Sequence, residues 1–272
     1  MKIITAYLTK NPCFKRNQAQ TDKRDVLFQN RGAKGLMLHS VGCAQPSAEV
    51  FCERWNKLTY TRACVHAFID ANNGIIYQTL PWNYRGWHAG KNIGNNEYIG
   101  VEMCESSHIK YVTSTKIQVL NWAKAQEECK KAYDSAVELF AYLCEKLHLD
   151  PMTDITSHVE GHEKGIASNH GDPVHYWNAL KTGYTMDRFR RDVRDAMTNS
   201  FALGIKYKVV SKDGYLNVRA GAGTSYAVIG KVKAGWTVKY YGRQDGKWMY
   251  IKKPSTGVEG WVHSAYLKKG LI

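Results

Sequence analysis

The feature that most constrains the fold is a change of sequence texture at Ile205. The segment after it, KYKVVSKDGYLNVRAGAGTSYAVIGKVKAGWTVKYYGRQDGKWMYIKKPSTGVEGWVHSAYL, has no helical period; its short Val-, Tyr- and Trp-rich runs are separated by DG, GAG, AG, DG and TG. Short strands at such regular spacing are typical of a small all-β barrel. A chain of 272 residues suits about two domains. We therefore expect one domain over residues 1–200 and an all-β barrel over residues 205–272.

Before this boundary the pattern alternates between strand and helix. KGLMLHSVG (34–42) and YIGVEMCE (98–105) suit buried strands, and VHAFIDANNGIIYQTL (65–80) contains Asn73-Gly74, a strong hairpin signal. Helices are expected around 47–57, after a capping Thr185, and over 115–148, where an apolar stripe comprises Ala132, Ala136, Leu139, Phe140, Leu143 and Leu147. This mixture predicts an α/β domain with a central mixed β-sheet flanked by helices.

Charge is distributed unevenly along the chain. Residues 1–204 hold 25 basic and 21 acidic residues, a balance of +4, whereas residues 205–272 hold 13 and 3, a balance of +10. The partners that suit such a basic segment are polyanions: nucleic acid, an anionic membrane surface or an anionic cell wall.

The first residues, MKIITAYLTKNPCFKRNQAQ, lack an apolar run long enough for a signal peptide, and no stretch approaches about 18 apolar residues. We expect a protein that is made in the cytoplasm without a signal peptide or transmembrane segment. All seven cysteines precede residue 145 and form no CxxC pair. Buried reduced thiols are the simplest interpretation, and a disulfide near the N-terminus remains an alternative.

Residues 157–173, SHVEGHEKGIASNHGDP, concentrate three histidines and an aspartate, and His39 ends a predicted buried strand. Catalytic zinc sites use three protein ligands, often His with Asp, Glu or Cys, and leave a position for water. Hydrogen-bonded strand-end histidines and Asp-Pro turns give the same pattern without a metal. Composition and spacing leave both interpretations open.

Longer motifs favour one of them. The ordered series GLMLHSVG, VHAFIDANNGIIYQ, RGWHAG, YIGVEMCE, ITSHVEGH and ASNHGDP resembles the zinc-dependent N-acetylmuramoyl-L-alanine amidases related to phage T7 lysozyme and the peptidoglycan recognition proteins. The resemblance covers most of residues 30–195. LNVRAGAGTSYAVIGKVKAG and GWVHSAYL resemble a bacterial SH3-type cell-wall-binding domain. Together they resemble a phage or prophage endolysin.

The resemblance implies roles for individual residues. His39, His158 and Asp172 match the family's zinc ligands, and His162 is expected to be a loop residue instead. Glu102 matches the acidic residue that serves as general base in many relatives; a strand-end ion pair is its alternative role.

His170 stands where several relatives carry Lys, so it is the candidate for stabilising the oxyanion. His66 occupies an active-site position that is Tyr or His in relatives. Trp87 and His88 resemble the rim of the substrate groove, although core packing would equally suit Trp87.

The implied reaction is hydrolysis of the amide between N-acetylmuramic acid and L-alanine by zinc-activated water. The barrel would hold the enzyme on peptidoglycan and on anionic cell-wall polymers, so that it acts on the cell wall. A phage-borne protein of this kind would rely on a separate holin, and a host autolysin is the other origin. The alternatives are a muropeptide-recycling amidase and a non-catalytic peptidoglycan recognition module. No nucleic acid partner is expected, since only the charge would support one.

Overall fold

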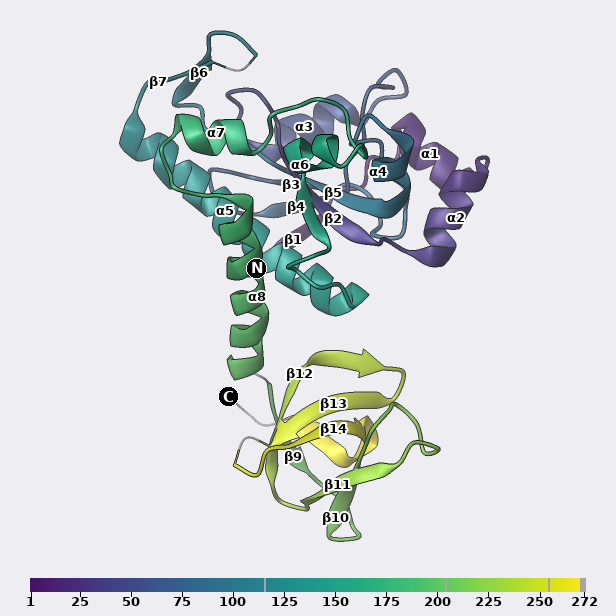
Figure 1. Ribbon diagram of the computed structural model, residues 1–272. Coiled ribbons are helices and arrows are strands. Elements are labelled where there is room, and N and C mark those ends of the chain that lie inside the picture. Colours follow the sequence, from purple (N-terminus) through teal and green to yellow (C-terminus); the bar gives the residue numbers. More distant parts are fainter. Residues whose placement is uncertain (115, 204, 254, 270–272) are drawn as a thin grey trace. The chain divides into compact units, whose positions relative to one another are not determined.

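A six-stranded sheet forms the centre of the first unit, Met1–Arg194, of the computed structural model (Figure 1). The strand order is β1-β4-β3-β5-β2-β8, and all neighbours are parallel except β3 and β4. This confirms the predicted mixed sheet. The structure describes residues 1–114, 116–203, 205–253 and 255–269. The strands are β1 (Ile3–Thr5), β2 (Gly35–Ser40), β3 (Ala67–Ile69), β4 (Ile76–Gln78), β5 (Tyr98–Met103) and β8 (Ile155–Ser157).

Strand β2 lies between β5 and β8, and all six of its residues are buried. A strand covered on both faces needs a continuous apolar run instead of an alternating one, which explains GLMLHS. The predicted hairpin is also confirmed, since β3 and β4 are antiparallel and joined through Gly74, whose φ is +72°. That left-handed backbone is readily adopted by glycine.

Helices surround this sheet. Helix α3 packs on β3 and β4, α5 on β3 and β5, and α6 on β2 and β8. The helices are α1 (Pro12–Ala19), α2 (Lys23–Arg31), α3 (Ala48–Trp55), α4 (Asn92–Glu97), α5 (Trp122–Leu147), α6 (His158–Glu163), α7 (Val174–Ala179) and α8 (Met186–Leu203). The predicted cap of α8 is confirmed, because the Thr185 hydroxyl accepts from the Arg188 amide.

The expected helical start at residue 115 is wrong. An antiparallel hairpin of β6 (Ile109–Tyr111) and β7 (Ile117–Val119) precedes α5, which begins at Trp122 after the Asn121 side chain caps it. The β-branched residues of KIQV favour a strand over the first turn of a helix. The apolar stripe of α5 is buried as expected, apart from the half-buried Leu147.

The second unit, Asp195–Ile272, contains a seven-stranded antiparallel sheet with the order β11-β10-β14-β13-β12-β9-β15. The all-β prediction for this part is confirmed, and its DG, AG, DG and TG turns place Gly214, Gly235, Gly246 and Gly257 at positive φ. Alternate side chains fill a core of Val209, Leu216, Val218, Val232, Val238, Ile251 and Val262. The elements are β9 (Ile205–Val209), β10 (Tyr215–Arg219), β11 (Val228–Lys233), β12 (Thr237–Asp245), β13 (Trp248–Lys253), β14 (Val258–His263), the 3-10 turn η1 (Ser264–Tyr266) and β15 (Leu267–Lys269).

All seven cysteines are free thiols; Cys43 and Cys52 are half-buried and the other five are buried. Within the described part of the chain, no helix combines the length and apolar character needed to cross a membrane.

Candidate functional site

Two parallel strands place the first pair of site residues. In the register of β2 and β5, His39 lies directly opposite Glu102. Because residues opposite each other in a sheet project from the same face, the imidazole and the carboxylate face one region near the carboxyl ends of their strands. Open sheets containing parallel strands commonly bind ligands at this end.

The next strand along the sheet brings the third residue. Strand β8 pairs with β2 and ends at Ser157, so His158 follows as the first residue of α6. A capping box fixes that helix start, since the Ser157 hydroxyl accepts from the Glu160 amide and Glu160 accepts from the Ser157 amide. Asp172 enters from the loop before α7, and all three side chains are buried.

The donor atoms of these three residues converge. His39 Nδ1 lies 3.1 Å from His158 Nδ1 and 3.1 Å from Asp172 Oδ2, and His158 Nδ1 lies 3.5 Å from Asp172 Oδ1. A tetrahedral zinc ion with bonds of about 2.1 Å separates its ligands by about 3.4 Å. Two imidazoles and one carboxylate at this spacing therefore fit zinc, with a fourth position left for another ligand.

A chain of hydrogen bonds orients His39. The His88 Nε2–H donates to the Tyr98 carbonyl at 3.0 Å, so neutral His88 has its lone pair on Nδ1. That atom lies 3.0 Å from His39 Nε2, which must donate to it. Burial lowers the pKa of both rings, which keeps them neutral. His39 therefore directs the lone pair of its Nδ1 toward His158 and Asp172.

A second set of contacts orients His158. The Ser168 hydroxyl donates to the Ala89 carbonyl and lies 3.1 Å from His158 Nε2, which therefore donates to the hydroxyl oxygen. His170 Nδ1 lies 3.1 Å from the same His158 nitrogen and 3.2 Å from the Ser168 hydroxyl. Nδ1 of His158 is left with a lone pair, as at His39. In the tautomer whose Nδ1 accepts, His170 carries its proton on Nε2 and offers a hydrogen-bond donor there.

The two carboxylates of the site differ in environment. Burial raises the pKa of Glu102 well above its usual value, and the charges of Asp172 and Glu105 add to the shift. Its Oε2 is buried without a hydrogen-bond partner among the described residues. Burial also acts to raise the pKa of Asp172, but the contacts of its carboxylate with the His158 and His39 imidazoles outweigh it, and that pKa lies below its usual range. Glu102 is therefore the better proton acceptor of the pair.

These groups open into a cavity of about 370 Å³. A hydrogen-bonded network includes the lining residue His175: the Tyr111 hydroxyl donates to Glu105 Oε2 at 2.7 Å and lies 2.8 Å from His175 Nε2. This network ties the β6–β7 hairpin, which carries Ser114, to the cavity. The lining residues are Ser40, Val41, Gly42, His88, Glu102, Ser114, His158, His170, Gly171, Asp172 and His175.

Two of the predicted site residues lie elsewhere. His66 is fully buried; its Nε2 donates to the Tyr84 carbonyl and its Nδ1 accepts from the Gly100 amide, so both ring nitrogens are bound to main chain. Trp87 packs in an apolar cluster with Leu8 and Phe14, and the Arg16 guanidinium lies 5.5 Å from its ring centroid. Neither lines the cavity.

His88 lines the cavity but is nine-tenths buried, and both of its nitrogens are committed to Tyr98 and His39. Its contacts are those of a residue that positions His39. His162, predicted to lie in a loop, is exposed on α6 and takes no part in the cluster.

Sequence reasoning did not single out Ser168, Tyr111 or Ser114, whereas His175, which follows Asp172 closely, was a candidate for the groove wall and lines the cavity. Ser168 stands two residues before His170 in ASNHGDP, and that proximity was a usable signal. Tyr111 and Ser114 come from a hairpin that was expected to be partly helical, so nothing local connected them to the site.

The chain was compared with known proteins. Residues 29–175 match the family described as N-acetylmuramoyl-L-alanine amidase, and residues 214–268 match bacterial SH3 domains. The structure of the hydrolase AmiA from Staphylococcus aureus is similar at 18% identity with a TM-score of 0.47, covering 62% of this chain and 75% of that chain. The catalytic domain of XlyA is similar at 19% identity with a TM-score of 0.45, covering 71% of this chain and 99% of that chain. The catalytic domain of PlyG is similar at 17% identity with a TM-score of 0.47, covering 72% of this chain and 95% of that chain.

Proposed function

Because the chain belongs to the N-acetylmuramoyl-L-alanine amidase family and also carries a bacterial SH3 domain, we propose that it is a zinc-dependent peptidoglycan amidase directed to the cell wall by that domain. The bond cut is the amide between N-acetylmuramic acid and L-alanine. One observation carries the zinc assignment: the donor atoms of His39, His158 and Asp172 lie 3.1 to 3.5 Å apart beside a cavity.

The three ligands proposed for zinc are His39 Nδ1, His158 Nδ1 and a carboxylate oxygen of Asp172. Zinc bound there supplies a Lewis acid, which favours deprotonation of water and polarises the amide carbonyl. The protein orients both imidazoles, through His88 for His39 and Ser168 for His158.

Glu102 is proposed as the general base. Its carboxylate lines the cavity, its Oε2 has no protein partner among the described residues, and its pKa is raised by burial. Oε2 takes the proton from the attacking water and gives it to the nitrogen of the leaving L-alanine. A carboxylate bound in an ion pair would be unsuited to that exchange, and no described basic side chain forms a salt bridge with Glu102.

His170 is proposed to stabilise the oxyanion through its Nε2–H, because its Nδ1 is engaged by His158 and it lines the cavity. A donor of this kind contributes about 10²- to 10³-fold in rate in other acyl-transfer sites. The buried contacts of His66 favour a structural role over a second oxyanion donor. For the groove, the lining favours His175 and Ser114 over Trp87 as substrate contacts.

We place the catalytic domain at residues 1–200 and the wall-binding domain at 205–272. The second has a charge of +10, which favours attachment to anionic wall polymers as well as to peptidoglycan. Attachment raises the effective concentration of the amide bonds near the catalytic domain. The pairing of an amidase with an SH3 domain favours action on the wall over recycling of soluble muropeptides, where no anchor is needed. An endolysin that reaches the wall through a holin is the origin we propose.

Digestion of purified Gram-positive sacculi tests the activity. With zinc-loaded protein we expect new L-alanine amino termini and no new reducing sugar ends by mass spectrometry, and neither with the chelated protein. Cleavage of soluble muropeptides alone would support recycling. Binding to sacculi without any cleavage would support a non-catalytic recognition module.

The role of Glu102 is tested by Glu102→Gln, with Glu163→Gln on the exposed surface of α6 as the matched control. Glu102→Gln should retain zinc and lose about 10²- to 10⁴-fold in kcat, because the amide cannot accept the proton. The control should leave kcat unchanged. A near-normal kcat in Glu102→Gln would assign the proton transfer to another group.

A further inference from the structure

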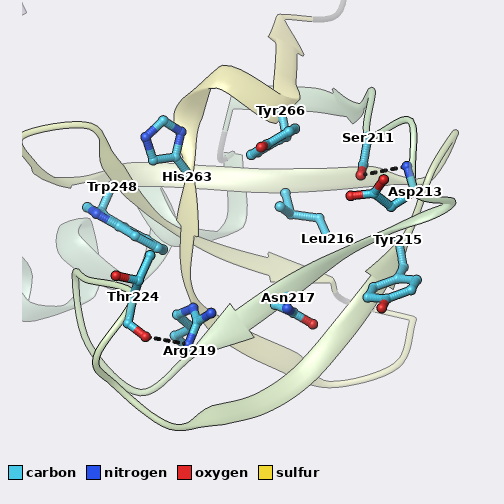
Figure 2. A pocket seen from close by; sticks show the side chains of 10 residues that line it. All are labelled: Ser211, Asp213, Tyr215, Leu216, Asn217, Arg219, Thr224, Trp248, His263 and Tyr266. Atoms are coloured by element: carbon cyan, nitrogen blue, oxygen red, sulfur yellow. Dashed lines mark hydrogen bonds between the residues drawn. The ribbon is translucent and has the colours of Figure 1, made fainter.

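The second unit contains a cavity of its own, about 310 Å³ in volume (Figure 2). Its floor comes from β10, where alternation sends Leu216 and Val218 toward the barrel core and Tyr215, Asn217 and Arg219 to the opposite face. Trp248, His263 and Tyr266 stand across from them, from β13, β14 and η1. The full lining is Ser211, Asp213, Tyr215, Leu216, Asn217, Arg219, Thr224, Trp248, His263 and Tyr266.

We propose that this cavity binds the sugar rings of the glycan strand, so that the second unit recognises neutral amino sugar in addition to any polyanion that its surface charge attracts. The proposal rests on the wall-binding function proposed above and names its ligand. The first argument is an unsatisfied group: Asn217 Oδ1 is buried and has no hydrogen-bond partner in the described residues. A buried acceptor of this kind requires a donor, and the hydroxyl or acetamido N–H of a sugar supplies one.

The cavity is preformed. Trp248 and His263 meet edge to face with ring centroids 5.5 Å apart, and the His263 and Tyr266 rings follow at 5.9 Å. At the other end, Arg219 Nη1 donates to the carbonyls of Thr224 at 2.9 Å and Tyr226 at 2.7 Å, which holds the 220–226 loop in place. Side chains fixed before binding lose little conformational entropy when a ligand arrives.

The charge of the lining does not suit a polyanion. The unit has a balance of +10, yet the cavity contains Asp213, one of only three acidic residues in 205–272, opposite a single arginine whose Nη1 is engaged by the loop. An extended anionic polymer would gain more from the exposed lysines than from this cavity. A cation would be opposed by the surrounding positive charge, and the Lys231 ammonium already lies 4.1 Å from the Tyr215 ring centroid. With polyanions and cations disfavoured, the ligand that best suits the cavity is neutral and polar.

A sugar suits the cavity better than a peptide. Extended peptides are commonly recognised by main-chain pairing at the edge of a sheet, and the edge strands here are β11 and β15. Neither contributes a lining residue. Recognition must therefore come from side chains, which here are aromatic rings beside Asp, Asn and Ser. Aromatic faces pack against the C–H face of a sugar ring while the polar groups bind its hydroxyls.

Calorimetric titration of the full chain tests this, in a Glu102→Gln background that prevents hydrolysis. The ligands are neutral oligosaccharides of N-acetylglucosamine, and stem peptides free of sugar. We expect the oligosaccharide to bind with a Kd that changes less than twofold between 0.1 and 0.5 M salt. Asn217→Leu should weaken it by about tenfold or more, because it removes the acceptor at similar volume, and Asn217→Asp should retain the acceptor and most of the affinity.

Ile229→Ala is the matched control, since Ile229 is 58% exposed on β11 and outside the cavity; its affinity should equal that of the parent. Thermal unfolding of every variant excludes loss of the fold as the cause. Binding of the peptide but not of the oligosaccharide would overturn the proposal, as would oligosaccharide binding that Asn217→Leu leaves unchanged. Sacculus digestion by the chain with Glu102 intact is measured in parallel. Digestion of sacculi without glycan binding would contradict the glycan-binding proposal but not the amidase function. Glycan binding without digestion would contradict the amidase function but not the glycan-binding proposal.

Discussion

At the scale of single residues, His88 decides which nitrogen of His39 can bind a metal. Replacing it with alanine removes the acceptor for His39 Nε2–H and leaves the ring free to turn or to move its proton to Nδ1. Outer contacts of this kind typically contribute 10- to 100-fold to metal affinity. His88→Ala should therefore raise the zinc dissociation constant by about that factor, measured by competition with a chromophoric chelator.

Two variants separate orientation from a general loss of packing. Gly100→Ala keeps His88 but places a Cβ 2.4 Å from its Cγ, so the ring must shift and zinc affinity should fall as it does for His88→Ala. His162→Ala removes an exposed histidine of α6 and should bind zinc normally. Normal affinity in both His88→Ala and Gly100→Ala would show that His39 needs no such support.

The raised pKa of Glu105 leads us to predict that the free energy of unfolding depends on pH. Burial raises the pKa of Glu105 to about 7, although hydrogen bonds from the Tyr111 hydroxyl and the Gly42 amide oppose the shift. The pKa is higher in the folded state than in the unfolded chain, so protonation favours folding. The stabilisation is complete below about pH 4.5 and is lost as the pH rises to about 7, by about 3 kcal/mol. Urea unfolding of zinc-free protein from pH 4 to pH 8 should show a smaller decline for Glu105→Gln, and equal declines would contradict this assignment.

The sequence indicated which residues converge at the site, but it did not indicate which neighbouring residues orient them. His39, His158 and Asp172 stood in recognisable motifs, and the structure brings their donor atoms together. His88 lies in the motif RGWHAG. This motif is equally compatible with a histidine on the rim of the groove and with a histidine that contacts His39 from behind. Which of them applies depends on the Gly100 backbone and the Tyr98 carbonyl, both on β5, and no local pattern encodes that contact.

At the scale of elements, the Tyr111 hydroxyl links the β6–β7 hairpin to His175, which lines the cavity. Tyr111→Phe would leave Glu105 Oε2 and His175 Nε2 without their shared partner, and buried groups left unpaired cost about 1–3 kcal/mol each. We expect a loss of that order in the free energy of unfolding. KM should rise while kcat changes little, because Ser114 moves with the hairpin and the reacting groups stay in place. Tyr142→Phe, on the exposed side of α5, is the matched control, and a fall in kcat alone would contradict the prediction.

The same hairpin shows that hydrophobic periodicity in the sequence cannot predict very short strands. Strongly patterned segments such as β2, β5 and the apolar stripe of α5 were predictable because burial selects a continuous apolar run in a strand covered on both faces and a helical period over several turns. The hairpin strands span three residues each, too few for a period to emerge, and they adjoin a long helix that dominates any window. The tertiary contacts of Tyr111 add to the local strand preference of KIQV in holding this segment in place.

At the scale of the whole molecule, the charge lies mainly in the part that is proposed not to perform the chemistry. Residues 205–272 have a balance of +10 against +4 for residues 1–204, so salt should affect attachment more than hydrolysis. The screening length falls from about 10 Å at 0.1 M to about 3 Å at 1 M salt, which weakens attraction between exposed charges. Cleavage of intact sacculi should therefore slow with added salt, while cleavage of a soluble muropeptide should hold nearly constant.

Measuring both rates with the full chain over the same salt series supplies the internal control, because any effect of salt on the catalytic groups appears in both. Lys206→Glu and Lys208→Glu together, on exposed positions of β9, lower the charge of the second unit by four without touching its cavity. They should lower sacculus cleavage at low salt and converge with the parent at high salt, where the attraction is already screened. Parallel decline of the two rates in the parent would instead assign the salt effect to the catalytic unit. A salt-resistant rate on sacculi that the lysine variants leave intact would assign attachment to contacts such as those of the Asn217 cavity.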